Sequence, residues 1–483
     1  MTNGSGHKKG NDVRRRQFIK TTATFASVAA VAGSTALGAA STEAKTDSKA
    51  ERPRPGYDYE VIVIGGGNAG AVAARDCMKH GYKTLLIEAG DRLGGRTFTT
   101  DFHGTPIELG GTWVYNNQPF VWSEIERYGL AIEETPGAVP DVMYLRMEDG
   151  QRLAFTETQL IEAMSGWELF AGSAREVVPR PYDLLYNRKA VLAADQVNAL
   201  EHLQGLELTP LQYAFNRGFI ELMANNEASA ISYAEILRYY ALGSAYFPTF
   251  MDALARFKLR DGTVNLINHM IEDGAPEVRM MTPVKSVADQ GDKVLVTTTA
   301  HEELTCEAVI SCLPMNVLVD VAFSPPLPTG VIAAGRERHV GQGIKVYIKV
   351  EGDIGNVAAV APGQPLNYAM TYKQAEDYTV LVAFGSSPGN LDGQAMQKAL
   401  SVLLPGVKML KHLAYDWNSE PYSKGTWASY RPHWIERYYD QFQKAQGRIF
   451  FGSGDHGEGW RGTIDGAIGA GIRAARQVRN HLG

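Results

Sequence analysis

Cysteine is scarce in this chain of 483 residues, and the three that occur are Cys77, Cys306 and Cys312. Their spacing fits neither a disulfide framework nor a metal site, so we expect three thiols packed in the core. An excess of basic residues is missing as well, because 47 Lys and Arg stand against 53 Asp and Glu. This balance argues against the basic face that nucleic-acid binding needs. The length allows two domains or one large composite domain.

A long, strongly apolar run is also missing, and this matters at the N-terminus. Arg15 and Arg16 precede an uncharged stretch, 21–40, that is rich in alanine, glycine, serine and threonine. A membrane anchor needs about 20 strongly apolar residues. We therefore interpret 1–40 as a twin-arginine export signal, with an anchor or a chance basic cluster as the alternatives. We expect export of the folded protein to the periplasm, a loose linker over 41–56 and no stable membrane anchor.

Glycines follow the first strongly apolar stretch of the chain. A run rich in β-branched residues, 59–64, leads into three consecutive glycines and then a helix-forming stretch. In this strand–turn–helix order, glycines permit the turn and close approach to a pyrophosphate, and the helix start offers free N–H groups to the phosphates. A second apolar run over 83–87 ends in an acid that is placed to accept hydrogen bonds from a ribose. The pattern predicts a dinucleotide site, with an ordinary βαβ unit as the alternative. The residues concerned are Gly65, Gly67, Asn68, Ala69 and Glu88.

Arginines and glycines continue after the ribose acid. Arg92, Gly95 and Arg96 suit a second set of contacts to phosphate, because the planar guanidinium groups are donors and the glycine lets the backbone approach closely. The segment Glu108-Leu109-Gly110-Gly111-Thr112-Trp113 follows, and two further glycine-bearing segments lie near the C-terminus, at 448–455 and 459–467. Through these segments, which extend from residue 57 to the end, the sequence resembles the flavin-dependent amine oxidases, the monoamine oxidase family.

The resemblance implies an α/β fold in which a Rossmann-type FAD-binding domain is interleaved with an α+β substrate domain. We expect the FAD-binding domain in three parts, 57–115, 258–324 and 444–483. The substrate domain is expected in two parts, 116–257 and 325–443. The first of these reads as mainly helical from its three- and four-residue apolar spacing. Its aromatic residues are expected to be mostly core, with some lining a substrate cavity; they are Phe219, Tyr239, Tyr240, Tyr246, Phe247 and Phe250.

By resemblance the cofactor is FAD. Val284 offers its backbone to adenine, Asp455 accepts a ribityl hydroxyl, and the helix start at Thr463 and Ile464 points N–H groups at the pyrimidine end of the ring. Some relatives attach the flavin through a cysteine where this chain has Thr426, so we expect FAD to be bound non-covalently. The other positions that the resemblance assigns to the flavin are Gly111, Thr112, Trp113, Trp417 and Gly454.

Four residues are expected to act on the amine. Lys345 opens an apolar strand, where burying an ammonium is costly, and the resemblance places it near the flavin; a surface lysine is the alternative. Trp427 matches one wall of an aromatic cage that holds the amine, with simple packing as the alternative. Thr463 stands where relatives carry the second aromatic wall, which leaves room for a bulkier amine. Trp113 is expected beside both the ring and the pocket.

Together these features predict FAD-dependent oxidation of an amine C–N bond to an imine, which hydrolyses to an aldehyde and an amine. Within the family the motifs look most like bacterial pseudooxynicotine and nicotine oxidases, which suggests a secondary methylamine as substrate. Three alternatives stay open. The substrate could be another primary amine or a polyamine, the reaction could be a desaturation or isomerisation on the same fold, or the protein could be a non-catalytic flavin carrier. Relatives use O2 or a cytochrome c as electron acceptor, and the resemblance suggests a homodimer.

Overall fold

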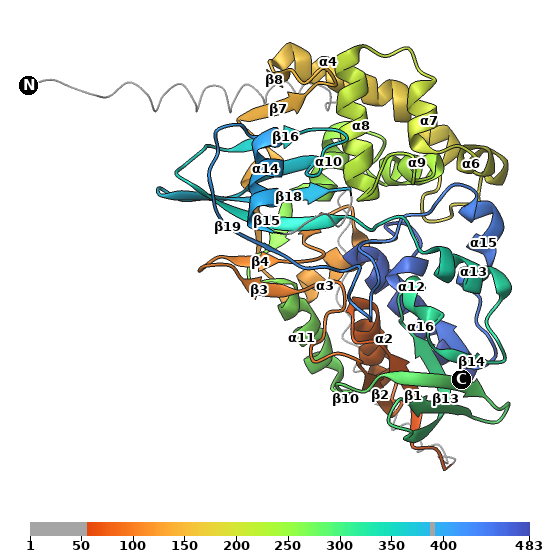
Figure 1. Ribbon diagram of the computed structural model, residues 1–483. Helices are drawn as coiled ribbons and strands as arrows, with labels where there is room; N and C mark the ends of the chain where they lie inside the picture. The colour runs from red at the N-terminus through yellow and green to blue at the C-terminus, as the bar shows by residue number, and fades with distance from the viewer. Residues whose placement is uncertain (1–55, 387–391) are drawn as a thin grey trace, which may run out of the picture. The chain divides into compact units, whose positions relative to one another are not determined.

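Residues 56–386 and 392–483 are described by the computed structural model, which Figure 1 shows as a ribbon. The predicted export signal lies outside these residues, as does the predicted linker up to residue 55. Among the described helices, none combines the length and the apolar character that a membrane crossing demands.

The β-branched run forms β1 (Tyr59–Ile64), near the centre of an eight-stranded sheet. It pairs in parallel with β2 (Thr84–Ile87) and β13 (Glu303–Ser311) and is almost wholly buried, as parallel strands between covering layers are. The remaining strands are β10 (Glu277–Arg279), β11 (Val284–Asp289), β12 (Val294–Thr298), β14 (Ala322–Ser324) and β20 (Ile449–Phe451). Segments from the three expected FAD-binding parts therefore share one sheet.

Three helices from distant parts of the sequence pack beside this sheet. Helix α2 (Asn68–Lys79) packs against both α11 (Thr263–Gly274) and α16 (Ile464–Leu482). At the α2–α16 contact, a Cβ added at Gly471 would lie 2.2 Å from the Ala69 carbonyl oxygen, so only glycine permits this approach. The close packing ties the C-terminal helix to the glycine turn after β1.

A second sheet of seven strands has the order β19-β15-β18-β17-β16-β7-β8. Its neighbours are antiparallel except for β16 and β7. The bounds are β7 (Val142–Arg146), β8 (Arg152–Ala154), β15 (Ile344–Glu351), β16 (Val357–Val360), β17 (Tyr368–Gln374), β18 (Tyr378–Gly385) and β19 (Met409–Ala414). The hairpin β7–β8 lies inside the region expected to be mainly helical. Local spacing could not reveal it, because β7 finds its partner β16 more than 200 residues later.

The segment 157–255 is largely helical, and its helices gather at the upper end of Figure 1, away from β1 and β2. The helices there are α4 (Glu157–Ala171), α5 (Ala174–Val177), α6 (Arg188–Asp195), α7 (Ala199–Gln204), α8 (Pro210–Ala224), α9 (Tyr233–Leu242) and α10 (Phe247–Ala255). Helix α8 packs against α4 and contacts β7 and β16, so it connects the helical layer to the second sheet. The other helices are α12 (Met315–Leu318), α13 (Thr329–Glu337), α14 (Gly393–Leu403) and α15 (Trp434–Phe442). Two smaller sheets contain β3 (Thr99–Asp101) with β4 (Pro106–Glu108), and β5 (Trp113–Val114) with β9 (Phe257–Leu259) and β6 (Ile132–Glu134).

Helix α3 (Pro119–Tyr128) begins without a capping side chain of its own. The N–H groups of Phe120 and Val121 instead donate to one oxygen of Asp465 on α16, at 2.7 and 2.9 Å. This carboxylate comes from 345 residues further along the chain and satisfies amides that would otherwise be orphaned at the helix start. The helix ends at Gly129, whose positive φ of 61° is the left-handed stop that glycine favours.

Candidate active site

A cavity of about 880 Å³ is lined by both sheets and by the loops between them. The loops after β1 and β2 form one end, and side chains from β15, β17, β18, α8, α9 and α10 form another. The volume lies in the range of cofactor and substrate sites. The described residues contain no cluster of three or more His, Cys, Asp or Glu that could hold a metal.

The glycine turn shapes the first end of the cavity. Gly65 has a φ of +103°, and a Cβ at Gly70 would lie 1.8 Å from the Gly65 carbonyl oxygen, so the turn requires both glycines. Helix α2 starts at Asn68 with no capping hydrogen bond from a side chain and no acid in its first turn. The buried Oδ1 of Asn68 also has no partner. A helix start without a capping side chain is suited to a diphosphate.

Glu88 and Arg92 stabilise the loops around this turn. The Glu88 carboxylate accepts from the N–H groups of Gly66 and Gly90, both at 2.7 Å, and lines the cavity. Arg92 donates to the Gly95 carbonyl at 2.9 Å and lies over the Trp417 ring at 5.6 Å. Both side chains line the cavity and also hold their loops in place, a second role that the sequence pattern did not indicate.

Arg96 and Asp455 form an ion pair, with Arg96 also donating to the Thr426 carbonyl at 2.8 Å. Arg96 lines the cavity, whereas Asp455 is fully buried and lies behind the lining residues. Its second oxygen accepts from the Met315 N–H at 2.8 Å. Burial opposes ionisation of Asp455, but Arg96 and His339 outweigh it and lower the pKa of the carboxyl. Asp455 therefore positions Arg96, and its expected contact with a ribityl hydroxyl stays a prediction.

The other expected flavin residues line the cavity: Gly67, Ala69, Gly95, Gly111, Thr112, Trp113, Val284, Trp417, Gly454, Thr463 and Ile464. The Thr463 hydroxyl donates to the Trp460 carbonyl at 2.7 Å and accepts from the Gly466 N–H, which caps α16. The indole of Trp417 donates to the Leu109 carbonyl at 3.0 Å. Cys312 is the described cysteine that lines the cavity, and it lies beside Gly65 rather than beside Trp427.

Lys345 is buried on β15, with 4% of its surface exposed. Its Nζ donates to the carbonyl oxygens of Glu108 and Gly110, at 2.7 and 2.8 Å, and to the Thr112 hydroxyl. It lies 4.8 Å from the centre of the Trp113 ring. Burial lowers the pKa of Lys345 to about 7, against the opposing attraction of the Glu108 carboxylate. The amine can therefore gain or lose a proton near neutral pH.

Aromatic rings surround the space beyond Lys345. The Phe384 ring lies 6.0 Å from Trp113 and 6.1 Å from Trp427, between centres. Trp427 is fixed by donation from its indole to the Met223 carbonyl at 2.8 Å. Of the six aromatics singled out in the helical part, Tyr239 lines the cavity and the others do not. The lining residues that sequence reasoning missed include Leu222, Met223, Met251, Leu254, Tyr368, Met370 and Phe384.

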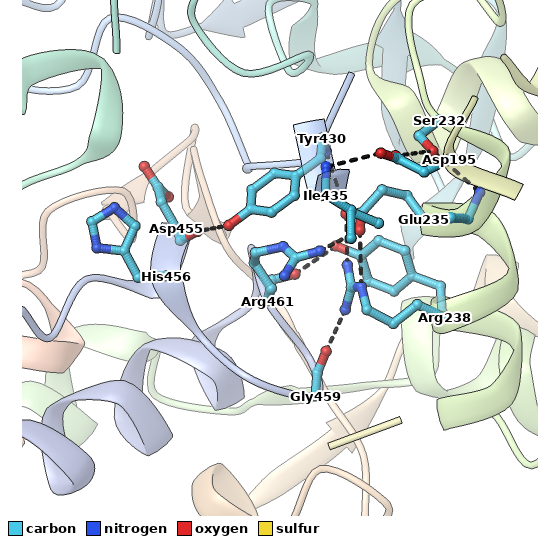
Figure 2. Close-up of polar contacts among 12 residues, drawn as sticks. Asp195, Ser232, Glu235, Arg238, Tyr430, Ile435, Asp455, His456, Gly459 and Arg461 are labelled. Carbon is cyan, nitrogen blue, oxygen red and sulfur yellow. Dashed lines mark hydrogen bonds and ion pairs between the residues drawn. The ribbon is translucent and has the colours of Figure 1, made fainter. Parts of the chain in front are cut away.

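A buried charge network holds the turn that leads to Thr463 (Figure 2). Glu235 on α9 accepts from Arg238 at 3.0 Å and pairs with Arg461. Arg238 donates to the Gly459 carbonyl, so both ends of the turn are tied to α9. Burial disfavours a charged Glu235, but the two guanidinium groups outweigh it and lower the pKa of the carboxyl. The network therefore positions one wall of the cavity from the helical layer.

A family model described as flavin containing amine oxidoreductase matches residues 69–479. The chain belongs to this family. A pseudooxynicotine dehydrogenase from a Pseudomonas species is 37% identical over all of this chain and 99% of that protein. A nicotine dehydrogenase from Pseudomonas putida is 35% identical over 98% of this chain and 99% of its own. Putrescine oxidase with bound putrescine shares the fold, with a TM-score of 0.74 and 21% identity over 87% of this chain and 99% of that one.

Membership of the flavin-containing amine oxidoreductases makes FAD the cofactor and amine oxidation the chemistry. The cavity fits FAD on its own evidence, since it offers an uncapped helix start, an unpartnered Asn68 oxygen and a carboxylate at Glu88. Arg92 and Arg96 add positive charge at the same end. The other end of the cavity is aromatic and has Lys345 at its edge.

Proposed function

We propose that this enzyme oxidises the C–N bond of an aromatic secondary methylamine, with pseudooxynicotine as the reference substrate. The amine loses two electrons and two protons to become an imine, which water hydrolyses to an aldehyde and methylamine. FAD, when bound, supplies the two-electron acceptor for this chemistry. The observation that carries the proposal is a buried lysine of lowered pKa at the edge of an otherwise apolar, aromatic pocket.

The pocket beyond Lys345 supports a substrate with a single cationic group. Its side chains are aliphatic, thioether or aromatic: Leu222, Met223, Tyr239, Met251, Leu254, Tyr368, Met370 and Phe384. The carboxylates that line the cavity belong to other regions. Glu88 and Asp91 follow β2, Asp320 pairs with Lys424, and Glu420 accepts from Tyr415. A second ammonium, as in putrescine, would lose its hydration without gaining a counter-charge, which is costly.

Lys345 supports the proton transfers. Amine oxidation needs the lone pair of a neutral amine, whereas a free methylamine arrives as an ammonium ion. Burial lowers the pKa of Lys345, so its ammonium gives up a proton more readily than a free lysine and the resulting amine can accept the substrate's proton, directly or through a water. The faces of Trp427 and Trp113 attract the incoming cation and exclude water from it.

Anaerobic titration of the holoenzyme tests the proposal. Pseudooxynicotine, nicotine, tyramine and putrescine are added separately while the absorbance of oxidised flavin is followed. We expect pseudooxynicotine to bleach the band at the lowest concentration and putrescine to have no effect. Readmission of air then shows whether O2 reoxidises the flavin or a cytochrome c is required. If dithionite bleaches the band and no amine does, the substrate assignment is wrong and a desaturase reaction is the next hypothesis.

We also propose export of the folded enzyme to the periplasm, on the strength of Arg15, Arg16 and the weakly apolar stretch that follows. In a native-type host, wild-type activity is expected in the periplasmic fraction. A chain with both arginines replaced by lysine should keep its activity in the cytoplasm. Equal distribution of the two chains would contradict export by the twin-arginine route.

A further inference from the structure

Three side chains form a row across the floor of the amine pocket. In the second sheet, Lys345 of β15 pairs directly with Phe384 of β18, and Phe384 pairs directly with Tyr368 of β17. Residues paired in this way point to the same face of a sheet, and all three line the cavity. Two strand spacings separate Lys345 from Tyr368, which is about 10 Å. The sheet register therefore fixes the distance between a base and a phenol.

The Tyr368 hydroxyl is poorly satisfied for a buried group. Tyr368 is 4% exposed, and its hydroxyl donates to the thioether of Met370 at 3.6 Å. A thioether sulfur is a weak acceptor, so this contact offsets little of the cost of removing a hydroxyl from water. Met370 lines the same cavity, which places the hydroxyl beside the space that a substrate would fill.

The other polar side chains around this end have stronger partners. The Tyr239 hydroxyl donates to the Arg461 carbonyl at 2.7 Å, and the Gln118 amide donates to the Ala253 carbonyl at 3.2 Å. The Trp427 indole and the Thr463 hydroxyl each donate to a backbone carbonyl. Among the described hydroxyl, amide and indole donors that line this end, Tyr368 is thus the one held only by sulfur.

We propose that Tyr368 is a specificity-determining residue, whose hydroxyl donates a hydrogen bond to an acceptor atom on the substrate at the end remote from the amine. The acceptor is a carbonyl oxygen or an aromatic ring nitrogen, and Phe384 supports the apolar link between acceptor and amine. This inference rests on the proposed function for the position of the amine. It adds that the enzyme selects amines bearing a neutral acceptor over amines that are apolar throughout.

The test compares wild type, Tyr368→Phe and Tyr372→Phe as holoenzymes. Tyr372 is a matched control on the same strand, because it is buried and its hydroxyl donates to the Pro106 carbonyl at 3.3 Å, outside the cavity lining. The probes are 1-(pyridin-3-yl)butan-1-one, 1-phenylbutan-1-one and butylbenzene, which carry both acceptors, the carbonyl alone and neither. None contains an amine, so their dissociation constants, read from the change in flavin absorbance, do not depend on amine oxidation. A separate titration with pseudooxynicotine reports on the proposed function.

Tyr368→Phe is expected to raise the dissociation constant of the pyridyl ketone about 2- to 12-fold, the effect of one neutral hydrogen bond. The phenyl ketone should weaken equally if the carbonyl is the acceptor, and hardly at all if the ring nitrogen is. Butylbenzene should bind within about twofold of wild type, and Tyr372→Phe should change none of the three. Equal weakening of all three probes by Tyr368→Phe would mean a packing role and overturn the inference, as would no change for the pyridyl ketone. Flavin content and melting temperature show whether each variant is folded.

Discussion

Glutamine at position 235 would remove the single negative charge between two buried guanidinium groups. Glu235 is fully buried, and Arg238 and Arg461 are each 1% exposed. Glutamine keeps the size of the side chain and one oxygen acceptor, so the change is almost purely electrostatic. The two arginines would then repel each other across a site that water does not reach.

Removing one partner of a buried ion pair typically costs about 3–5 kcal/mol of unfolding free energy. Because glutamine retains an acceptor for one guanidinium, we expect Glu235→Gln to cost about 3 kcal/mol. The unfolding entropy is about 2.1 cal/mol/K per residue, or about 0.9 kcal/mol/K for the roughly 420 described residues. The melting temperature should therefore fall by about 3–4 °C.

Calorimetric scanning of the holoenzyme at one fixed scan rate measures this shift. Glu227→Gln, at an exposed position in the loop between α8 and α9, is the control and should melt within about 1 °C of wild type. Because the pair is buried, the loss should persist when the salt concentration is raised. A Glu235→Gln variant as stable as wild type would refute the reasoning, since the arginines would then not need this charge.

Four further outcomes are expected. Lys345→Met should slow flavin reduction by about 100-fold or more while FAD stays bound. Lys349→Met, on the same strand but outside the cavity, should react like wild type. Rapid mixing with amine measures both rates, and an unchanged rate for Lys345→Met would remove Lys345 from the chemistry. The lowered pKa of Lys345 has a consequence for stability too: between pH 7 and 10 the unfolded chain holds a proton that the folded chain has lost, so wild-type stability rises over this range. The melting temperature of Lys345→Met minus that of wild type should therefore be largest at pH 6 and smallest at pH 10. A difference that stays the same across this pH range would contradict the lowered pKa. His456 is buried with both nitrogens unpartnered and its pKa lowered to about 4, so the unfolded state takes up its proton first as the pH falls from 6.5. His456→Phe should lose less stability than wild type between pH 6.5 and 4.5 in unfolding titrations, unless the ring reaches water. Acid precipitation should leave all the flavin in solution, and a yellow pellet would show a covalent bond.

The nucleotide end of the site could be predicted from the sequence because its determinants are contiguous. Gly65, Gly67 and Glu88 act through the strand, turn and helix that they belong to, so a local pattern is sufficient. Lys345 was also predictable, because a lysine inside an apolar run is conspicuous without any partner. Each of these residues lines the cavity.

The amine end could not be predicted in the same way. Phe384 and Tyr368 face the cavity only because β15, β18 and β17 pair in one particular register, and a shift of one residue would turn them to the other face. Asp455 has contacts that a motif does not record, because its two oxygens accept from Arg96 and from the Met315 amide, which lie in distant segments. Its expected contact with a ribityl hydroxyl stays a prediction.

The start of α3 has a consequence for the order in which a growing chain can fold. Its first amides wait for Asp465, which is synthesised 345 residues later. At about 5–20 residues per second, the ribosome needs roughly 20–70 s to supply that carboxylate. Asp195 shows the reverse order, because it is synthesised 240 residues before the Ile435 amide that donates to it. The start of α3 is therefore left without its partner until translation is almost complete, and chaperones have a long interval in which to bind the N-terminal half.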